Sequence, residues 1–263
     1  MENNSPSATS QGSQTLFPPA RGFSAGRALI TFAALLVAVL IGNVAPSIQW
    51  VLAQKTDPYT LQHPPAGIAL GVLAGTDVAA IICLVALLPW AAGTSFAGLG
   101  FRTPSVRTIA FAVAGALAMV IFTDGLESML QTALHVKVSE QAVTLFLSMK
   151  TPATKGLFAL LGIVVAAVAE EMAFRVLLFN AVRKYARFAV AALASSVLFG
   201  LVHATPGVPL LQNLILTLPL AVGGVILCAV YAKTENAFAP MITHGLFNAV
   251  SFVALIFAPQ LGK

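Results

Sequence analysis

Charge is what this sequence has least of. Only 9% of its 263 residues are Asp, Glu, Lys or Arg, whereas 58% are hydrophobic. Because a soluble domain carries roughly a quarter charged residues, this scarcity excludes an ordinary soluble protein. Uncharged runs recur along the chain, each near the roughly 20 residues that cross a hydrocarbon core. We therefore predict an all-α fold, a polytopic transmembrane helix bundle.

Clustered basic residues and paired cysteines are also lacking. The formal net charge is +5, but the Lys and Arg residues are scattered among loops, which excludes a nucleic-acid partner. They are better suited to setting topology and contacting the headgroups of membrane lipid. The two cysteines, Cys83 and Cys228, lie in apolar runs and are interpreted as buried small hydrophobic residues.

The apolar runs predict about seven spans, and an eighth span or a re-entrant segment is the alternative. Residues 1–26 are rich in Ser, Gln, Asn and Pro, which is typical of a disordered tail. The first apolar run starts too late for a secretory signal, so 27–263 is predicted to be a single transmembrane domain. The predicted spans are 28–53, 66–92, 106–131, 156–181, 188–205, 210–232 and 238–258.

Loop charges give the expected orientation and location. Counting Lys and Arg in the loops favours an N-terminus on the inner side. We expect an integral, multi-pass protein of the cell membrane of a prokaryote.

Ionisable residues within the spans are few. Each costs about 2.5–3.5 kcal/mol at bilayer depth on insertion scales, so each needs a reason. Asp77, Asp124 and Glu127 receive no role, although the last two could share a helix face that reaches the interface. The others are Glu170, Glu171, Arg175, His203 and His244.

The stretch from Ala169 to Arg175, AEEMAFR, interrupts an apolar span with three charges. A spacing of four places Glu171 and Arg175 on one helix face, where they can pair. Glu170 points about 100° away and is left without a partner. It is therefore a candidate proton acceptor.

Two later spans supply histidines. His203 ends the stretch FGLVH, and a lone membrane histidine commonly serves helix packing. His244 and Asn248 are four residues apart in HGLFN, so imidazole and carboxamide share a face. Both can donate hydrogen bonds toward one point, as a developing oxyanion requires.

Taken together, these segments predict a polar cavity built from three spans. A glutamate and a histidine could hold and deprotonate a water, and a histidine and an asparagine could stabilise a tetrahedral intermediate. The sequence lacks a G-x-S-x-G elbow and an H-E-x-x-H pair. Water is therefore the better candidate nucleophile.

The three motifs resemble those of the CPBP family, the CAAX prenyl proteases and bacteriocin-processing enzymes, also called Abi. Its signatures are E-E-x-x-x-R, F-x-x-x-H and H-x-x-x-N or H-x-x-x-D. They stand here in the family's order, and the resemblance covers roughly 154–258. The matching residues are Glu170, Glu171, Arg175, Phe199, His203, His244 and Asn248.

The resemblance implies an intramembrane endopeptidase acting on a peptide or protein substrate, prenylated in the family's eukaryotic members. It implies that Glu170 and His203 activate the water, while His244 and Asn248 form the oxyanion hole. Glu171 and Arg175 are assigned to positioning, with Phe199 in support. We expect no metal or other cofactor; zinc held by a glutamate and two histidines is the alternative.

Two other functions stay open. A non-catalytic membrane scaffold or immunity-type protein could keep the motifs without turnover. A proton-coupled transporter also uses intramembrane Glu and His residues, but no matching set stands in the N-terminal half.

Overall fold

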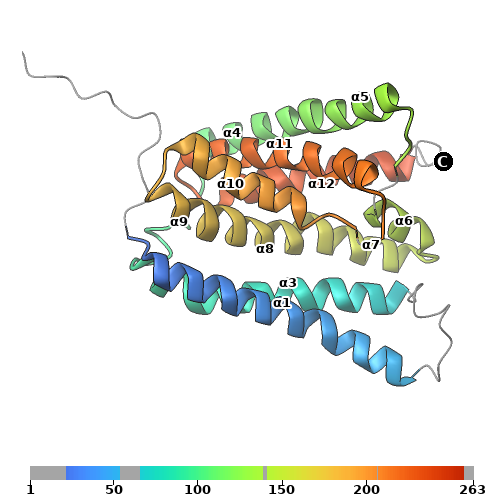
Figure 1. The fold of residues 1–263 in the computed structure, drawn as a ribbon, viewed down its shortest axis with the longest axis horizontal. Helices are drawn as coiled ribbons and strands as arrows, with labels where there is room; N and C mark the ends of the chain where they lie inside the picture. The colour runs from blue at the N-terminus through green and yellow to red at the C-terminus, as the bar shows by residue number, and fades with distance from the viewer. Residues whose placement is uncertain (1–21, 54–65, 139–140, 206, 258–263) are drawn as a thin grey trace, which may run out of the picture.

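A computed structural model of the chain describes residues 22–53, 66–138, 141–205 and 207–257. All regular structure in these ranges is helical, and the helices run roughly alongside one another (Figure 1). The predicted all-α polytopic bundle is confirmed. Residues 1–21 of the predicted tail lie outside the described residues, and its last two residues belong to α1, which begins at Ala25.

The first two long helices form a hairpin. Helices α1 (Ala25–Ala53) and α3 (Ala66–Ala92) contact each other along much of their length. A β-carbon on Gly42 would stand 2.3 Å from the carbonyl oxygen of Gly75, so only glycines permit this approach. Small residues at the interface serve helix packing in membranes in this way.

The middle of the chain forms a long continuous helical segment and a short connecting helix. Helix α4 (Val106–Met119) continues through the π-helical segment η1 (Val120–Asp124) into α5 (Gly125–Leu134). The short helix α6 (Gln141–Ser148) follows. Ser105 caps α4 by accepting a hydrogen bond from the Thr108 backbone N–H, which satisfies one of its free donors.

Five consecutive helical segments form one continuous rod, which contains Glu170 and Glu171. Thr151 caps its start in the same manner as Ser105 caps α4. The rod then alternates between α-helix and π-helix up to Arg183. Its segments are α7 (Pro152–Leu160), η2 (Leu161–Ala166), α8 (Ala167–Glu171), η3 (Met172–Phe179) and α9 (Asn180–Arg183).

Three helices complete the bundle: α10 (Phe188–Leu201), α11 (Leu210–Thr234) and α12 (Phe238–Phe257). Within the described residues, six helical segments are long and apolar enough to cross a membrane, and α10 is shorter. The predicted span 188–205 is therefore a helix of 14 residues that ends at Leu201. The stretch after it, ATPGVP, contains two prolines and a glycine, which do not continue a helix.

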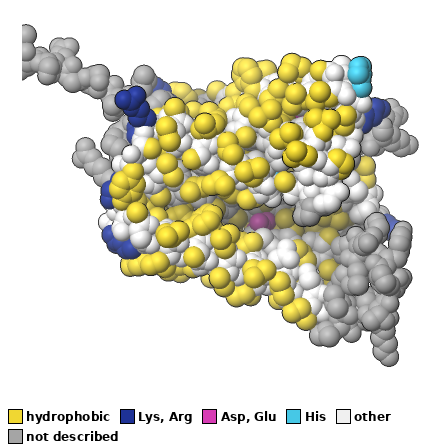
Figure 2. Space-filling model, viewed as in Figure 1, with side chains coloured by type: hydrophobic (Ala, Val, Ile, Leu, Met, Phe, Trp, Pro, Cys, Tyr) yellow, Lys and Arg dark blue, Asp and Glu magenta, His cyan; other side chains and the backbone are white. Residues whose placement is uncertain are grey.

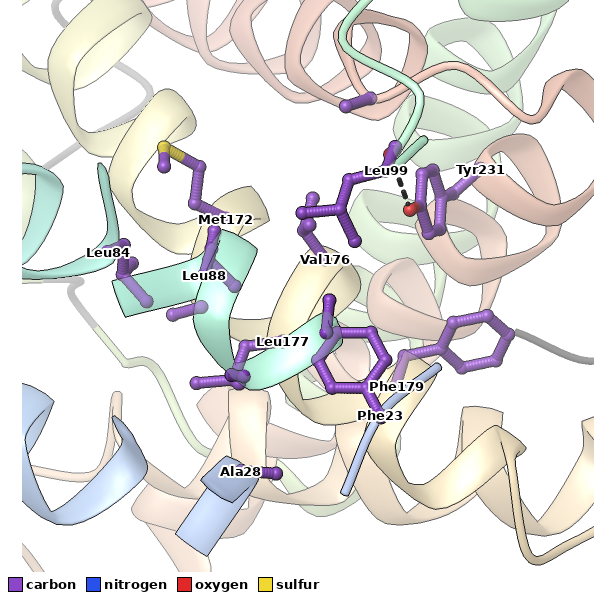
Figure 3. Packing of buried hydrophobic residues seen from close by; sticks show 14 of the residues in the cluster. Phe23, Ala28, Leu84, Leu88, Leu99, Met172, Val176, Leu177, Phe179 and Tyr231 are labelled. Atoms are coloured by element: carbon purple, nitrogen blue, oxygen red, sulfur yellow. Dashed lines mark hydrogen bonds between the residues drawn. The ribbon is translucent and has the colours of Figure 1, made fainter. Parts of the chain in front are cut away.

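The core lies between the glutamate rod and its neighbours. Met172, Val176 and Leu177 belong to the same buried hydrophobic cluster as Leu84 and Leu88 of α3 (Figure 3). Beyond the core, hydrophobic side chains cover the surface while Lys and Arg gather toward the ends of the bundle (Figure 2). This distribution suits an integral membrane protein, which has lipid around its middle and water at its ends.

Candidate active site

The two glutamates lie in the middle of the rod, between two π-helical segments. Glu170 and Glu171 end α8, with η2 before them and η3 after them. Single π-helical turns inside α-helices are frequent at functional sites, because they change which side chains face a neighbour. The segments of this rod contact four other long helices: α3, α10, α11 and α12.

Glu170 meets both histidines. Its Oε1 lies 3.9 Å from Nε2 of His203, and its Oε2 lies 3.8 Å from Nε2 of His244. A quarter of its side-chain surface is exposed, so the carboxylate is accessible as well as enclosed. The sequence left Glu170 without a partner; the structure instead places it against two imidazoles, because α10 and α12 both pack against the rod.

Glu171 is the more deeply buried acid and has two partners. Its Oε1 accepts a hydrogen bond from Arg175 Nη1 at 3.0 Å, the pair that the spacing predicts. The same oxygen lies 2.9 Å from Nδ1 of His244, a contact between distant spans that the sequence did not indicate. Both Glu171 and Arg175 have side chains that are 0% exposed. Glu171 thus joins the buried cation to the imidazole.

Arg175 is held by two further groups. Its Nη2 donates to the carbonyl oxygen of Gly224 on α11 at 3.3 Å. The guanidinium carbon stands 4.4 Å from the centre of the Phe199 ring, a close cation–π contact. A β-carbon on Gly224 would lie 2.8 Å from that of Ser196, so glycine is needed there. Nothing in the sequence singled out Gly224, because a glycine within a span is usually interpreted as a helix-packing residue.

Phe199 forms a wall of the site. Its ring meets the imidazoles of His203 and His244 edge to face, with ring centres 4.9 Å and 5.8 Å apart. It is buried, and the Arg175 guanidinium lies against it as well. The phenylalanine of the F-x-x-x-H motif therefore touches both histidines and the arginine.

Neighbouring acceptors determine the orientation of both histidines. Nδ1 of His203 lies 2.7 Å from the carbonyl oxygen of Phe199, and that oxygen can only accept. His244 Nδ1 faces a carboxylate, which also accepts. In each neutral ring Nδ1 is therefore the donor, and the lone pair on Nε2 faces Glu170.

The same side chains are the candidate ligands in the alternative prediction of a zinc site. A carboxylate and two Nε2 lone pairs are of the right type for zinc, with Nδ1 hydrogen-bonded in the usual manner. Among the described residues, however, no group of three or more His, Cys, Asp and Glu side chains is spaced to hold a metal ion.

Asn248 lies one turn beyond His244 on α12. Its Nδ2 donates to the carbonyl oxygen of Gly162 in η2 at 2.8 Å, which joins α12 to the rod. One amide proton is thereby used and a second stays available. Its role as an oxyanion donor stays a prediction.

Of the three acids without a predicted role, Asp77 lies on α3, whereas Asp124 and Glu127 are three residues apart at the junction of η1 and α5. Asp77 is buried on α3, which packs against α8, and no hydrogen bond to its Oδ2 is found among the described residues. Asp124 is exposed, and Glu127 accepts a hydrogen bond from Gln131 at 2.8 Å.

Comparison with known proteins supports the motif assignment. Residues 152–250 match the model of the family described as type II CAAX prenyl endopeptidase, Rce1-like. The matched stretch is less than half of the chain, yet it contains all seven motif residues from Glu170 to Asn248. The predicted resemblance to the CAAX proteases is confirmed over these residues, and it indicates a CAAX-protease-type enzyme. No curated protein and no solved structure matches the chain.

Proposed function

We propose that this chain is an intramembrane endopeptidase in which Glu170 and His203 activate a water molecule for attack on a peptide bond. One observation carries the proposal: a partly exposed carboxylate within a span lies against the Nε2 atoms of two histidines, one on α12 and one just beyond the end of α10. Intramembrane ionisable groups are costly and mark functional sites. The match to the CAAX proteases supplies the reaction class.

Glu170 and His203 can together accept a hydrogen bond from each of the two protons of the attacking water. The carboxylate accepts one proton, and the Nε2 lone pair of His203 accepts a hydrogen bond from the other. The water's own lone pair is then left for the substrate carbonyl carbon. As the oxygen attacks, Glu170 takes its proton as general base.

The opposite side of the cluster suits the oxyanion. In this role His244 carries a proton on both ring nitrogens: Nδ1 donates to Glu171, and Nε2 donates to the oxyanion. The free amide proton of Asn248 is the second donor. When the tetrahedral intermediate breaks down, Glu170 returns its proton to the leaving amine, giving a new carboxylic acid and a new amine.

Glu171 and Arg175 are positioning residues in this proposal. Arg175 neutralises Glu171, and Glu171 fixes the His244 ring. Phe199 holds both imidazoles at set angles.

We propose a mechanism without metal. If zinc were bound, Glu170, His203 and His244 would hold it, and it would supply Lewis acidity and an activated water. The metal-free mechanism is supported by the spacing of the described His, Cys, Asp and Glu side chains, no three of which are grouped to hold a metal ion, and no step is assigned to a metal.

The substrate class follows from the family description. We propose a peptide or protein reached from the membrane, and a prenylated C-terminal CAAX peptide is the first candidate.

Reconstitution in proteoliposomes with a peptide library tests the proposal. The library holds matched farnesylated and unmodified CAAX peptides together with unrelated sequences. We expect the wild type to cleave a subset, and Glu170→Gln to fold normally and cleave none. Glu127→Gln is the matched control, because it removes an acid elsewhere in the chain, and it should retain activity.

Absence of cleavage by the wild type across the library would favour the non-catalytic scaffold. Uptake of a solute or protons that depends on Glu170, without cleavage, would favour the transporter. Cleavage that is equal in the wild type and in Glu170→Gln would refute the assigned role of the glutamate.

A further inference from the structure

His203 lies just beyond the end of a helix that stops early. Helix α10 has 14 residues, so at 1.5 Å per residue its length is about 21 Å, against a hydrocarbon core of about 30 Å. The segment that follows therefore turns back toward α11 at membrane depth. Backbone N–H and C=O groups at that depth need partners from the protein.

Asn213, near the start of α11, supplies those partners. Its Oδ1 accepts from the Thr205 backbone N–H at 2.8 Å, and its Nδ2 donates to the Thr205 carbonyl oxygen at 3.0 Å. The same Nδ2 also donates to the carbonyl oxygen of Val208 at 3.1 Å. The Asn213 side chain thus bonds both the backbone N–H and the carbonyl oxygen of Thr205, as the backbone of a neighbouring β-strand would.

Among the described residues, the other hydrogen bond within this turn joins two backbone groups. The Val208 backbone N–H donates to the Thr205 carbonyl oxygen at 3.3 Å, and Gly207 adopts φ +81°, which favours glycine. Without the Asn213 amide, the Thr205 N–H and the Val208 carbonyl oxygen would each lose the partner described above. An unsatisfied backbone group away from water is costly, so the turn would rearrange.

His203 depends on this turn for its position. Its backbone N–H donates to the Gly200 carbonyl oxygen at 3.0 Å, which continues the end of α10. Thr205, whose backbone N–H and carbonyl oxygen are bonded to Asn213, follows two residues after His203. The His203 side chain is 34% exposed and has less packing to hold it than His244, which is 7% exposed.

We propose that Asn213 is a positioning residue of the reaction: by clamping the turn at Thr205 and Val208, it holds Nε2 of His203 against Glu170. This inference rests on the proposed function, in which His203 and Glu170 share the attacking water. A carboxamide is required, since the clamp needs one acceptor and two donated hydrogen bonds from the same short side chain.

Two substitutions separate the parts of the clamp. Asn213→Ala removes all three hydrogen bonds. Asn213→Asp retains an oxygen for the Thr205 N–H but loses both donated bonds. The neighbouring Gln212→Ala changes another polar side chain of α11 and is the matched control.

The experiment measures kcat and KM on a peptide that the wild type cleaves, the apparent Tm in detergent, and hydrogen exchange across residues 202–209. We expect Asn213→Ala to lose about 10- to 100-fold in kcat, as residues that orient a reacting group do, with KM within about twofold. Exchange at Thr205 should accelerate, and Tm should stay near that of the wild type. Gln212→Ala should match the wild type throughout.

Unchanged kcat and unchanged exchange in Asn213→Ala would overturn the proposal. A loss of kcat only in proportion to lost folded protein would do so as well. If Asn213→Ala does not fold, Asn213→Asp decides by the same measurements. If the wild type cleaves nothing, the proposed function fails, and exchange at Thr205 still decides whether Asn213 holds the turn.

Discussion

Replacing Arg175 by methionine should destabilise the protein far more than a typical substitution in a span. Methionine is similar in length, so the packing changes little while the charge is lost. The Glu171 carboxylate keeps His244 as a partner but loses the buried cation 3.0 Å away. The Gly224 carbonyl oxygen loses its donor, and the Phe199 ring loses the guanidinium.

The size of this effect follows from the burial of the pair. Both side chains are 0% exposed, and removing one partner of a buried ion pair costs about 3–5 kcal/mol. For a chain of this size we expect the Tm to fall by roughly 6–20 °C, followed by circular dichroism in detergent. The double substitution Glu171→Gln with Arg175→Met removes both charges and leaves an oxygen for His244. It should recover much of the loss, because an isolated buried charge is no longer present.

A normal Tm for Arg175→Met combined with lost activity would refute this reasoning and give Arg175 a direct catalytic role. A double variant no more stable than the single one would show that the charge of Glu171 is not what Arg175 compensates.

Four other outcomes can be checked. Activity should survive prolonged chelation, and stoichiometric zinc lost and restored together with activity would contradict the metal-free mechanism. Asn248→Ala should lower kcat by about 100-fold if its amide stabilises the oxyanion; a small change would remove it from that role. Gly42→Val should separate α1 from α3 and cost about 1–3 kcal/mol in thermal unfolding, since its β-carbon would meet Gly75, whereas Gly67→Ala meets nothing within 4 Å. Thr243→Val should cost about 1 kcal/mol in the same assay, because the buried hydroxyl donates to the Ala112 carbonyl oxygen on α4 at 3.0 Å.

Local spacing predicted the parts of the site that lie within one turn of helix. The Glu171–Arg175 pair follows from a separation of four, and the shared face of His244 and Asn248 follows in the same way. Hydrophobic runs predicted the bundle and most of its spans. Both signals depend on residues near one another in the chain.

Contacts between helices were beyond this reasoning. Nothing local to Glu171 indicates that its second partner is His244, 73 positions away. The clamp of Asn213 on Thr205 could not be foreseen either, because an asparagine near a helix start reads as a polar flank. The early end of α10 was visible in principle in ATPGVP, but the apolar run outweighed those breakers in the span prediction.

In the rod that carries the glutamates, with π-helical segments on both sides of α8, a change in length by a single residue would alter the site. An ordinary membrane anchor tolerates one residue more or less, because only its hydrophobic length is tested. In this rod, Gly162 in η2 accepts from Asn248, while Glu170 meets His244 one turn earlier on the same helix α12. Removing one residue between Gly162 and Glu170 could leave a continuous helix, yet it would turn one part against the other by roughly 100°. The span would still insert and pack, but Glu170 and the Gly162 carbonyl oxygen that accepts from Asn248 would face different neighbours. Alignments of related chains should therefore place insertions and deletions outside the stretch from Gly162 to Glu170.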